Sequence, residues 1–136
     1  MTAKEYLKQA EWIELRIQIK RDELERYKRM ATSMGFTLSD MPSGTRDVHS
    51  TEMILVKIID LEREIQTELD RLVAIKVNTT EKLSKMKDGN HRLLLELRYI
   101  KNERWEHIAW YMRCSLRSVY RHHGLALKEF EKILNS

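Results

Sequence analysis

Two arginines one helical turn apart, Arg117 and Arg121, are the side chains of this 136-residue chain best suited to contact nucleic acid. A guanidinium can donate paired hydrogen bonds to a guanine edge, or it can bind phosphate oxygens. Beside them, Leu116 could contact a thymine methyl group, while Ser118 and Tyr120 carry hydroxyl donors. The alternatives stay open at this point: a solvated charged face for the arginines, and ordinary packing for Leu116 and Tyr120.

These side chains need two helices joined by a tight turn, and residues 105–127 (WEHIAWYMRCSLRSVYRHHGLAL) fit that requirement. The first helix has its apolar residues at the i, i+3, i+4, i+7 spacing of one buried face: Trp105, Ile108, Ala109 and Met112. Ser115 is expected to cap a second helix over residues 115–128 that buries Val119, Ala126 and Leu127. Arg113 stands at the turn position where glycine is common, and a positive φ is uncommon for other residues. Gly124 either allows a close backbone approach or marks a bend. The pattern predicts a helix-turn-helix whose second helix enters the major groove of DNA.

The charge distribution supports this interpretation, because residues 1–90 carry 16 Lys/Arg and 16 Asp/Glu, whereas residues 91–136 carry 9 and 5. The excess positive charge therefore surrounds the predicted helix-turn-helix, where contacts to phosphates require it. We expect Arg98, Lys101, Arg104 and Lys128 to hold phosphates. The predicted DNA-binding residues are Lys101, Arg104, Arg113, Ser115, Leu116, Arg117, Ser118, Tyr120, Arg121 and Lys128.

Other chemistries lack their residue patterns. Cys114 is the single cysteine, so no intrachain disulfide can form, and a reducing cytoplasm is expected. His107, His122 and His123 are not spaced as structural zinc ligands, and we expect no metal or cofactor. His122 is expected to be a satisfied core histidine and Cys114 a core residue. No catalytic triad or glycine-rich phosphate loop is present, so an enzyme is not expected, and no stretch is apolar enough for a membrane helix.

The first part of the chain predicts a helical hairpin, with helices over about 3–34 and 51–78 and a loop over 35–50 that contains the only proline. Apolar residues recur at alternating spacings of four and three, as in the seam of a coiled coil. Each seam contains one charge, and folding the chain back places Lys20 opposite Glu68. Off-seam apolar residues must be covered by the C-terminal domain, a second subunit or a partner: Trp12, Leu15, Ile19, Leu55, Ile59 and Leu69.

Between the hairpin and the helix-turn-helix we expect a joint that begins near Asn78–Thr80 and continues through Lys85–Asn90. Thr80 could cap a short helix carrying Leu83 and Met86, which ends at Asp88–Asn90. A following helix, HRLLLELRYI (91–100), should brace the motif by packing Leu93, Leu94, Leu97 and Ile100. The expected fold is thus all-α, with a hairpin domain over residues 1–78 and a helix-turn-helix domain over residues 79–136.

The C-terminal stretch resembles a known type of DNA-binding domain. It is similar to the helix-turn-helix of sigma-factor region four and, more closely, to phage regulators of Gram-positive bacteria of the ArpU and RinA kind. The residues that carry the resemblance are Arg98, Tyr99, Trp105, Ile108, Ala109, Ser115, Arg117, Val119, Tyr120, Arg121, His123, Ala126 and Leu127.

The resemblance implies a phage-encoded transcription regulator, an activator of late or packaging genes, in the cytoplasm of a bacterial host. Its implied partners are double-stranded DNA and host RNA polymerase, and the hairpin is expected to form a homo-oligomer. Two other functions remain open. One is DNA packaging of the small-terminase type, whose DNA-binding module commonly precedes its oligomerising helices, the reverse of the order here. The other is a helical module that binds another protein.

Overall fold

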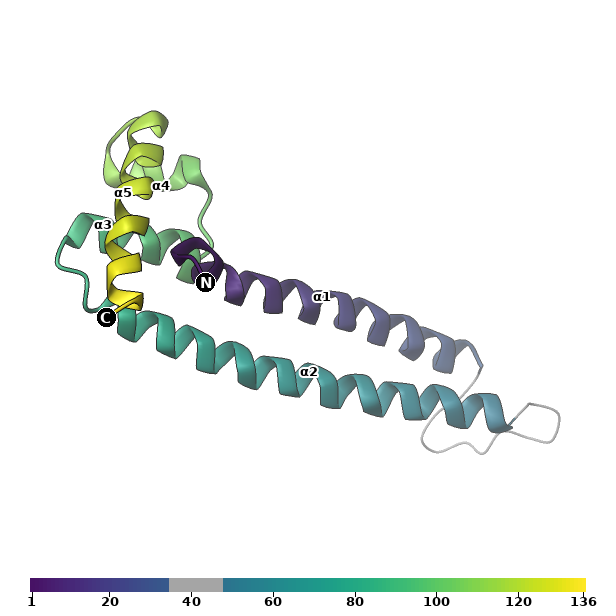
Figure 1. Cartoon of the computed structure of the whole chain (residues 1–136). Coiled ribbons are helices and arrows are strands. Elements are labelled where there is room, and N and C mark those ends of the chain that lie inside the picture. The colour runs from purple at the N-terminus through teal and green to yellow at the C-terminus, as the bar shows by residue number, and fades with distance from the viewer. Residues whose placement is uncertain (35–47) are drawn as a thin grey trace. The chain divides into compact units, whose positions relative to one another are not determined.

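The computed structural model describes residues 1–34 and 48–136 and contains only helices over these ranges, which confirms the all-α class. The elements in chain order are α1 (Ala3–Ser33), α2 (Val48–Leu83), α3 (Gly89–Leu95), the π-helical turn η1 (Glu96–Ile100), α4 (Trp105–Met112) and α5 (Leu116–Leu134) (Figure 1). Most of the predicted loop, residues 35–47, lies outside the described residues, and residues 48–50 already belong to α2. No helix in the described ranges is long and apolar enough to cross a membrane.

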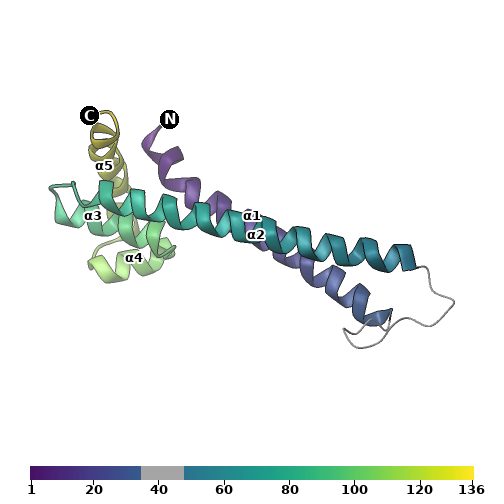
Figure 2. The same ribbon diagram turned by 90° about the horizontal axis from the view of Figure 1, so that it is seen from below.

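The predicted hairpin is present as a long antiparallel pair formed by α1 and α2 (Figures 1 and 2). The first part of the predicted joint, Asn78–Thr80, is wrong, because α2 continues without a break to Leu83. Its second part agrees with the structure, since the break between α2 and α3 falls before Gly89, within the predicted stretch Lys85–Asn90. The buried positions of α2 continue at the same spacing through Thr79 and Leu83, while Thr80 is exposed within the helix and caps nothing. Continued burial on one face therefore outweighs the weak helix propensity of the paired threonines.

The chain divides into two compact units, Ile13–Arg71 and a second unit made of Met1–Trp12 together with Leu72–Ser136. This division differs from the boundary predicted at residue 78. The reason lies in the core of the second unit, where Ala3 and Leu7 of α1 are buried together with Leu83 and Phe130. The first turns of α1 thus belong to the same packed unit as the C-terminal helices.

Within Ile13–Arg71, the seam is buried at Ile13, Ile17, Leu61 and Ile65, as the heptad spacing predicts. The predicted meeting of Lys20 with Glu68 is wrong. The Lys20 ammonium lies 3.0 Å from a carboxylate oxygen of Glu64, one helical turn away from Glu68. The long lysine stem allows the charge to leave the seam and reach a partly exposed partner.

Glu68 remains in the seam and is only 7% exposed. Its Oε1 lies 3.8 Å from Arg16 and 3.7 Å from Arg71, which are long distances for ion pairs. Its Oε2 is buried and has no hydrogen-bond partner among the described residues. Burying a charge with incomplete compensation costs free energy, so Glu68 is a destabilising position within an otherwise apolar seam.

The off-seam apolar residues of this unit remain largely uncovered by the described chain. Leu15, Ile19 and Ile59 are each more than half exposed, whereas Leu55 and Leu69 are half-buried. Trp12, which belongs to the other unit, is also exposed. Cover by the C-terminal domain, by a second subunit and by a partner therefore remain the alternatives that the sequence leaves open.

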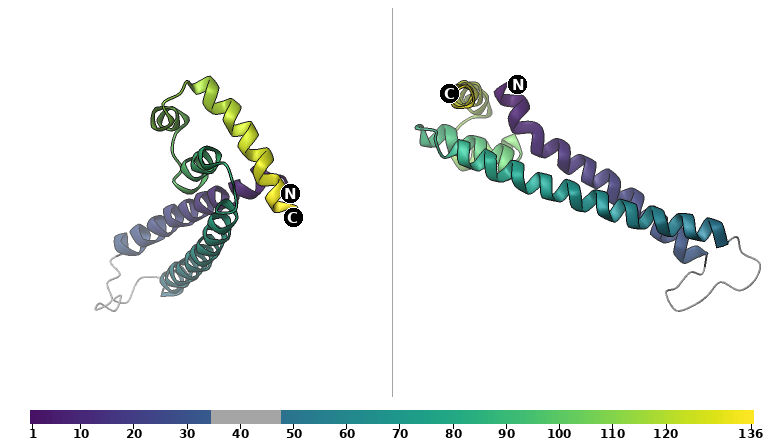
Figure 3. Two further views of the ribbon diagram at one scale, coloured as in Figure 1. Left: turned by 90° about the vertical axis from the view of Figure 1, so that its left-hand side faces the viewer. Right: turned by 60° about the horizontal axis from the view of Figure 1, so that its bottom comes forward.

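The brace predicted under the motif is formed by α3 and the π-helical turn η1, and α5 packs against both α3 and α4 (Figure 3). Leu94 is fully buried, and Leu97 and Ile100 are half-buried, as expected. Leu93 is instead exposed, and Leu95 and Tyr99 take buried positions that the sequence did not indicate. Tyr99 lies within the wider π-helical turn, which departs from the 3.6-residue period and so changes which residue faces the core there.

Candidate nucleic-acid interface

The predicted helix-turn-helix is formed by α4, a three-residue turn and α5. Arg113 has the left-handed conformation expected of this turn position, with φ 54° and ψ 45°. The amide of Cys114 donates a 3.1 Å hydrogen bond to the carbonyl of Ala109, which closes the end of α4. Ser115 caps α5 as predicted, since its Oγ accepts a 3.1 Å hydrogen bond from the amide of Ser118.

The buried faces of the two helices meet as their spacing predicts. Ile108 of α4 and Val119 and Ala126 of α5 have no exposed surface, and Leu127 is half-buried. Trp105, Ala109 and Met112 pack against the same core. Cys114 also packs there, in agreement with the core role expected of it. The second helix is longer than predicted and extends to Leu134.

The structure leaves nine of the ten predicted DNA-binding residues exposed, and Ser118 is half-buried. Leu116 is 37% exposed and Tyr120 is 49% exposed, so neither is purely a core residue. Ser115 uses its Oγ as the helix cap, although its hydroxyl hydrogen can still be donated. The exposed cations of this set are Lys101, Arg104, Arg113, Arg117, Arg121 and Lys128.

None of these six cations forms an ion pair with an acidic residue of the described chain. Acidic side chains do pair with basic ones elsewhere in this unit, for example Glu96 with Arg92 at 2.6 Å. A group of unpaired cations produces a positive potential that attracts phosphate. The arrangement is therefore chemically suited to an anionic polymer.

Arg98 does not belong with these cations, so its predicted phosphate contact is not supported. Its guanidinium lies 4.4 Å from the centre of the Trp105 ring and donates a 3.0 Å hydrogen bond to the carbonyl of Glu103. Both contacts are local to the connection between η1 and α4. Arg98 therefore fixes the first residue of α4 against the brace.

Around Trp105 lies an aromatic cluster that the sequence reasoning did not predict as a unit. The His123 ring lies edge-on to Trp105 with 4.7 Å between ring centres, and Tyr120 lies at 5.4 Å from the same ring. The hydroxyl of Tyr99 is 2.7 Å from Nε2 of His123. The cluster could have been predicted from the pattern that carries the family resemblance, because that pattern contains all four of its residues: Tyr99, Trp105, Tyr120 and His123.

Burial of this cluster alters its acid–base chemistry. Desolvation, together with the nearby Lys4 and Arg98 charges, lowers the pKa of His123 to about 4. Desolvation raises the pKa of Tyr99 to about 12, so its hydroxyl remains protonated and can donate to a neutral His123. The pair is therefore a neutral hydrogen bond that attaches α5 to η1.

His122 differs from its prediction as a satisfied core histidine. It is half-buried, and its Nδ1 is buried with no hydrogen-bond partner among the described residues. Its ring lies 5.7 Å from that of His91. The inward direction was predicted correctly, but the hydrogen bond was not, because periodicity gives a side chain's direction without giving its partners.

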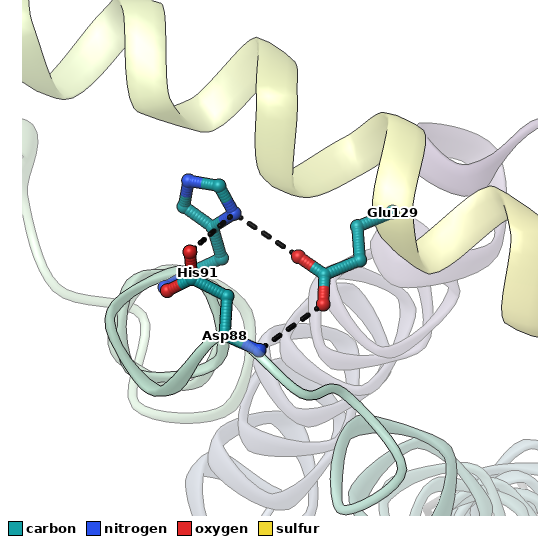
Figure 4. Close-up of side chains that lie close together, drawn as sticks. All are labelled: Asp88, His91 and Glu129. Carbon is teal, nitrogen blue, oxygen red and sulfur yellow. Dashed lines mark hydrogen bonds and ion pairs between the residues drawn. The ribbon is translucent and has the colours of Figure 1, made fainter.

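Asp88, His91 and Glu129 form a second polar cluster that the sequence did not indicate (Figure 4). Glu129 Oε1 accepts hydrogen bonds of 3.2 Å from the amides of Lys87 and Asp88, and its Oε2 is 3.0 Å from Nδ1 of His91. Asp88 caps α3 by accepting from the amides of Asn90 and His91. The His91 amide is the main cause that lowers the pKa of Asp88.

This cluster is the group in the described residues with suitable ligand atoms for a cation, since those atoms lie within 4.8 Å of one another. One oxygen of each carboxylate is, however, used by backbone amides, and the other faces His91 (Figure 4). These hydrogen bonds join the start of α3 to α5 and give the cluster a structural role.

An exposed aromatic pair lies at the end of α4. Trp110 is 75% exposed, and its ring packs edge-on against Tyr111 at 5.2 Å. An open hollow of about 770 Å³ lies beside this pair, lined by Ala109, Trp110, Tyr111, Arg113, Cys114 and Ser115. The sequence reasoning missed both residues as surface features, although they fall off the apolar stripe of α4.

Comparison of the chain with protein-family models, with curated proteins and with solved structures finds no match.

Proposed function

We propose that this protein is a DNA-binding transcription regulator that reads duplex DNA with the first turns of α5. The observation that carries the proposal is the local geometry of α4, the left-handed turn at Arg113 and α5, whose start is capped by Ser115. This geometry holds Arg117 and Arg121 exposed and without acidic partners on one face of α5. A helix presented in this way can enter a major groove and contact base edges.

The roles within the interface follow from position along the helix. Leu116, Arg117, Ser118 and Arg121 lie in the first two turns of α5, where a recognition helix contacts bases. Lys101 and Arg104 precede α4, and Lys128 lies further along α5, so these three cations hold phosphates at the edges. Arg98 is left out of this set because Trp105 and Glu103 already engage it.

The resemblance to phage regulators supports the finer part of the proposal, in which the targets are late or packaging genes and host RNA polymerase is a partner. The exposed apolar residues of the hairpin support assembly into a homo-oligomer, since Leu15, Ile19 and Ile59 have no cover within the described chain. A dimer would place two recognition helices on two half-sites about one turn of DNA apart.

The proposal is tested by selecting binding sites for the full-length protein from a randomised duplex library and measuring affinity across a salt series. Arg117→Ala should relax the sequence preference and cost about 1–3 kcal/mol of binding free energy. Lys128→Ala should weaken binding to all sequences alike and lower the salt slope by about one. Lys57→Ala, which removes an exposed cation of the hairpin, is the matched control and should change neither.

Failure to enrich any sequence, together with equal effects of Arg117→Ala and Lys57→Ala, would contradict the proposal. The mass of the protein in solution gives a separate outcome. A dimer agrees with a regulator, whereas a large ring would indicate DNA packaging.

A second candidate function, a helical module that binds another protein, is favoured by the exposed Trp110 and Tyr111 pair. Large exposed aromatic residues are typical of protein interfaces. Under this function, partner binding should be lost on Trp110→Ala and retained when Arg117 and Arg121 are both replaced by alanine. The regulator function predicts that the double alanine variant loses DNA binding.

A further inference from the structure

Gly124 lies in the middle of α5, where a helix tolerates glycine poorly. Glycine loses more conformational freedom in a helix than any other residue, and only proline is less favourable in a helix interior. A glycine at such a position normally has a local reason, either a strained backbone or a neighbour too close for a side chain.

Neither local reason applies to Gly124. A Cβ atom built at this residue would meet no atom within 4 Å apart from its chain neighbours and the surrounding backbone of α5, so no side chain or other element of the described chain fills the space. The φ angle of Gly124 is not in the left-handed region, where glycine would be favoured. The residue is also exposed, and α5 continues beyond it for ten further residues to Leu134.

The position of Gly124 on the helix surface is specific. Arg117, Arg121, Gly124 and Lys128 follow one another at spacings of four, three and four, which keeps them within about 60° of arc on one face. All four residues are exposed, and the three side chains are cations without acidic partners in the described chain. Gly124 therefore leaves bare helix backbone between Arg121 and Lys128, which lie about 10 Å apart along the axis.

We propose that Gly124 is the point of closest approach between α5 and the sugar–phosphate backbone of bound DNA. Arg121 and Lys128 flank the bare surface, so a phosphate seated there lies between two cations. Because Gly124 has no Cβ, the DNA backbone can contact the helix backbone directly. Glycine permits the same close approach where a polypeptide binds a pyrophosphate. This inference rests on the proposed function and adds a residue that determines how deeply the helix is seated.

The test compares Gly124→Ala and Gly124→Leu with wild-type protein, using the full chain and a duplex selected as described above. Gly89→Ala and Gly89→Leu are the matched controls, since a Cβ at Gly89 also meets nothing within 4 Å and Gly89 lies at the start of α3. Each protein is measured for thermal unfolding and for DNA affinity at one fixed salt concentration.

Gly124→Ala should raise the Tm by about 2–5 °C, because alanine is the better helix former and nothing obstructs it. The same variant should bind the duplex at least tenfold more weakly, and Gly124→Leu more weakly still. The Gly89 variants should bind DNA as the wild type does.

Unchanged DNA affinity of both Gly124 variants would overturn the inference while leaving the proposed function intact. A lower Tm for Gly124→Ala would also overturn it, because the chain itself would then require the glycine. If the wild type binds no duplex at all, the proposed function fails and this inference fails with it.

Discussion

Lowering the pH should destabilise the aromatic cluster of the helix-turn-helix through a single histidine, His123. Burial lowers the pKa of His123 to about 4 from its usual value of 6.5. Between these two values the unfolded chain binds a proton that the folded chain does not, so stability rises with pH across this window. The contribution is fully present above about pH 6.5 and is lost as the pH falls toward about 4.

The magnitude follows from the width of this window. At about 1.4 kcal/mol for each pH unit, the interval from 6.5 to about 4 corresponds to at most about 3 kcal/mol. The His123 ring is only partly buried, and solvent screening reduces the expected loss to about 2 kcal/mol. Protonation would also remove the acceptor at Nε2, which the hydroxyl of Tyr99 uses at 2.7 Å.

Urea unfolding followed by tryptophan fluorescence measures this effect, because Trp105 contacts the His123 ring. The free energy of unfolding of the wild type is compared with that of His123→Gln at several pH values from about 7 down to about 4.5. Other groups titrate equally in both proteins, so their contributions cancel in the difference. As the pH falls, the wild type should lose about 2 kcal/mol more of its free energy of unfolding than His123→Gln loses. Parallel pH dependence of wild type and His123→Gln would refute the reasoning.

Three further predictions concern stability. Arg113→Gly should stabilise the protein by about 1 kcal/mol in urea unfolding, since φ of 54° is strained for arginine and free for glycine; a loss of stability would show that the Arg113 side chain is needed for folding. Ser115→Ala should cost about 1 kcal/mol by removing the cap of α5, and Ser115→Asp should restore most of it, both measured by thermal unfolding; equal loss in both variants would exclude capping as the cause. Glu68→Leu should stabilise the hairpin by about 1–2 kcal/mol, because leucine replaces a buried carboxylate with an unpartnered oxygen; chemical denaturation that gives a lower midpoint would show that the contacts with Arg16 and Arg71 are worth more than their distances suggest.

The sequence predicted those features that depend on periodicity and local backbone chemistry. The hairpin seam, the buried faces of α4 and α5, the cap at Ser115 and the left-handed turn at Arg113 all follow from spacing and residue type over a few positions. These are local effects, so a single sequence contains them.

The features that sequence reasoning missed depend on contacts between distant residues. The Glu129 hydrogen bonds to the start of α3 and the engagement of Arg98 by Trp105 both require the folded arrangement. Lys20 pairs with Glu64 and not with Glu68, because a long, flexible side chain can reach either of two partners one helical turn apart. The burial of Tyr99 was missed because it lies in the π-helical turn η1, which no pattern in the sequence marks.

The discontinuous make-up of the C-terminal unit affects the order in which the protein can fold. Its core contains Ala3 and Leu7 from the beginning of α1 together with Phe130 from near the end of α5. During synthesis the first turns of α1 leave the ribosome long before their packing partners exist. The core of the helix-turn-helix therefore closes only after the last helix has been made, and such distant contacts slow folding. A fragment beginning at residue 79 would lack these residues, so an isolated C-terminal fragment should fold poorly even though it contains the complete DNA-reading motif.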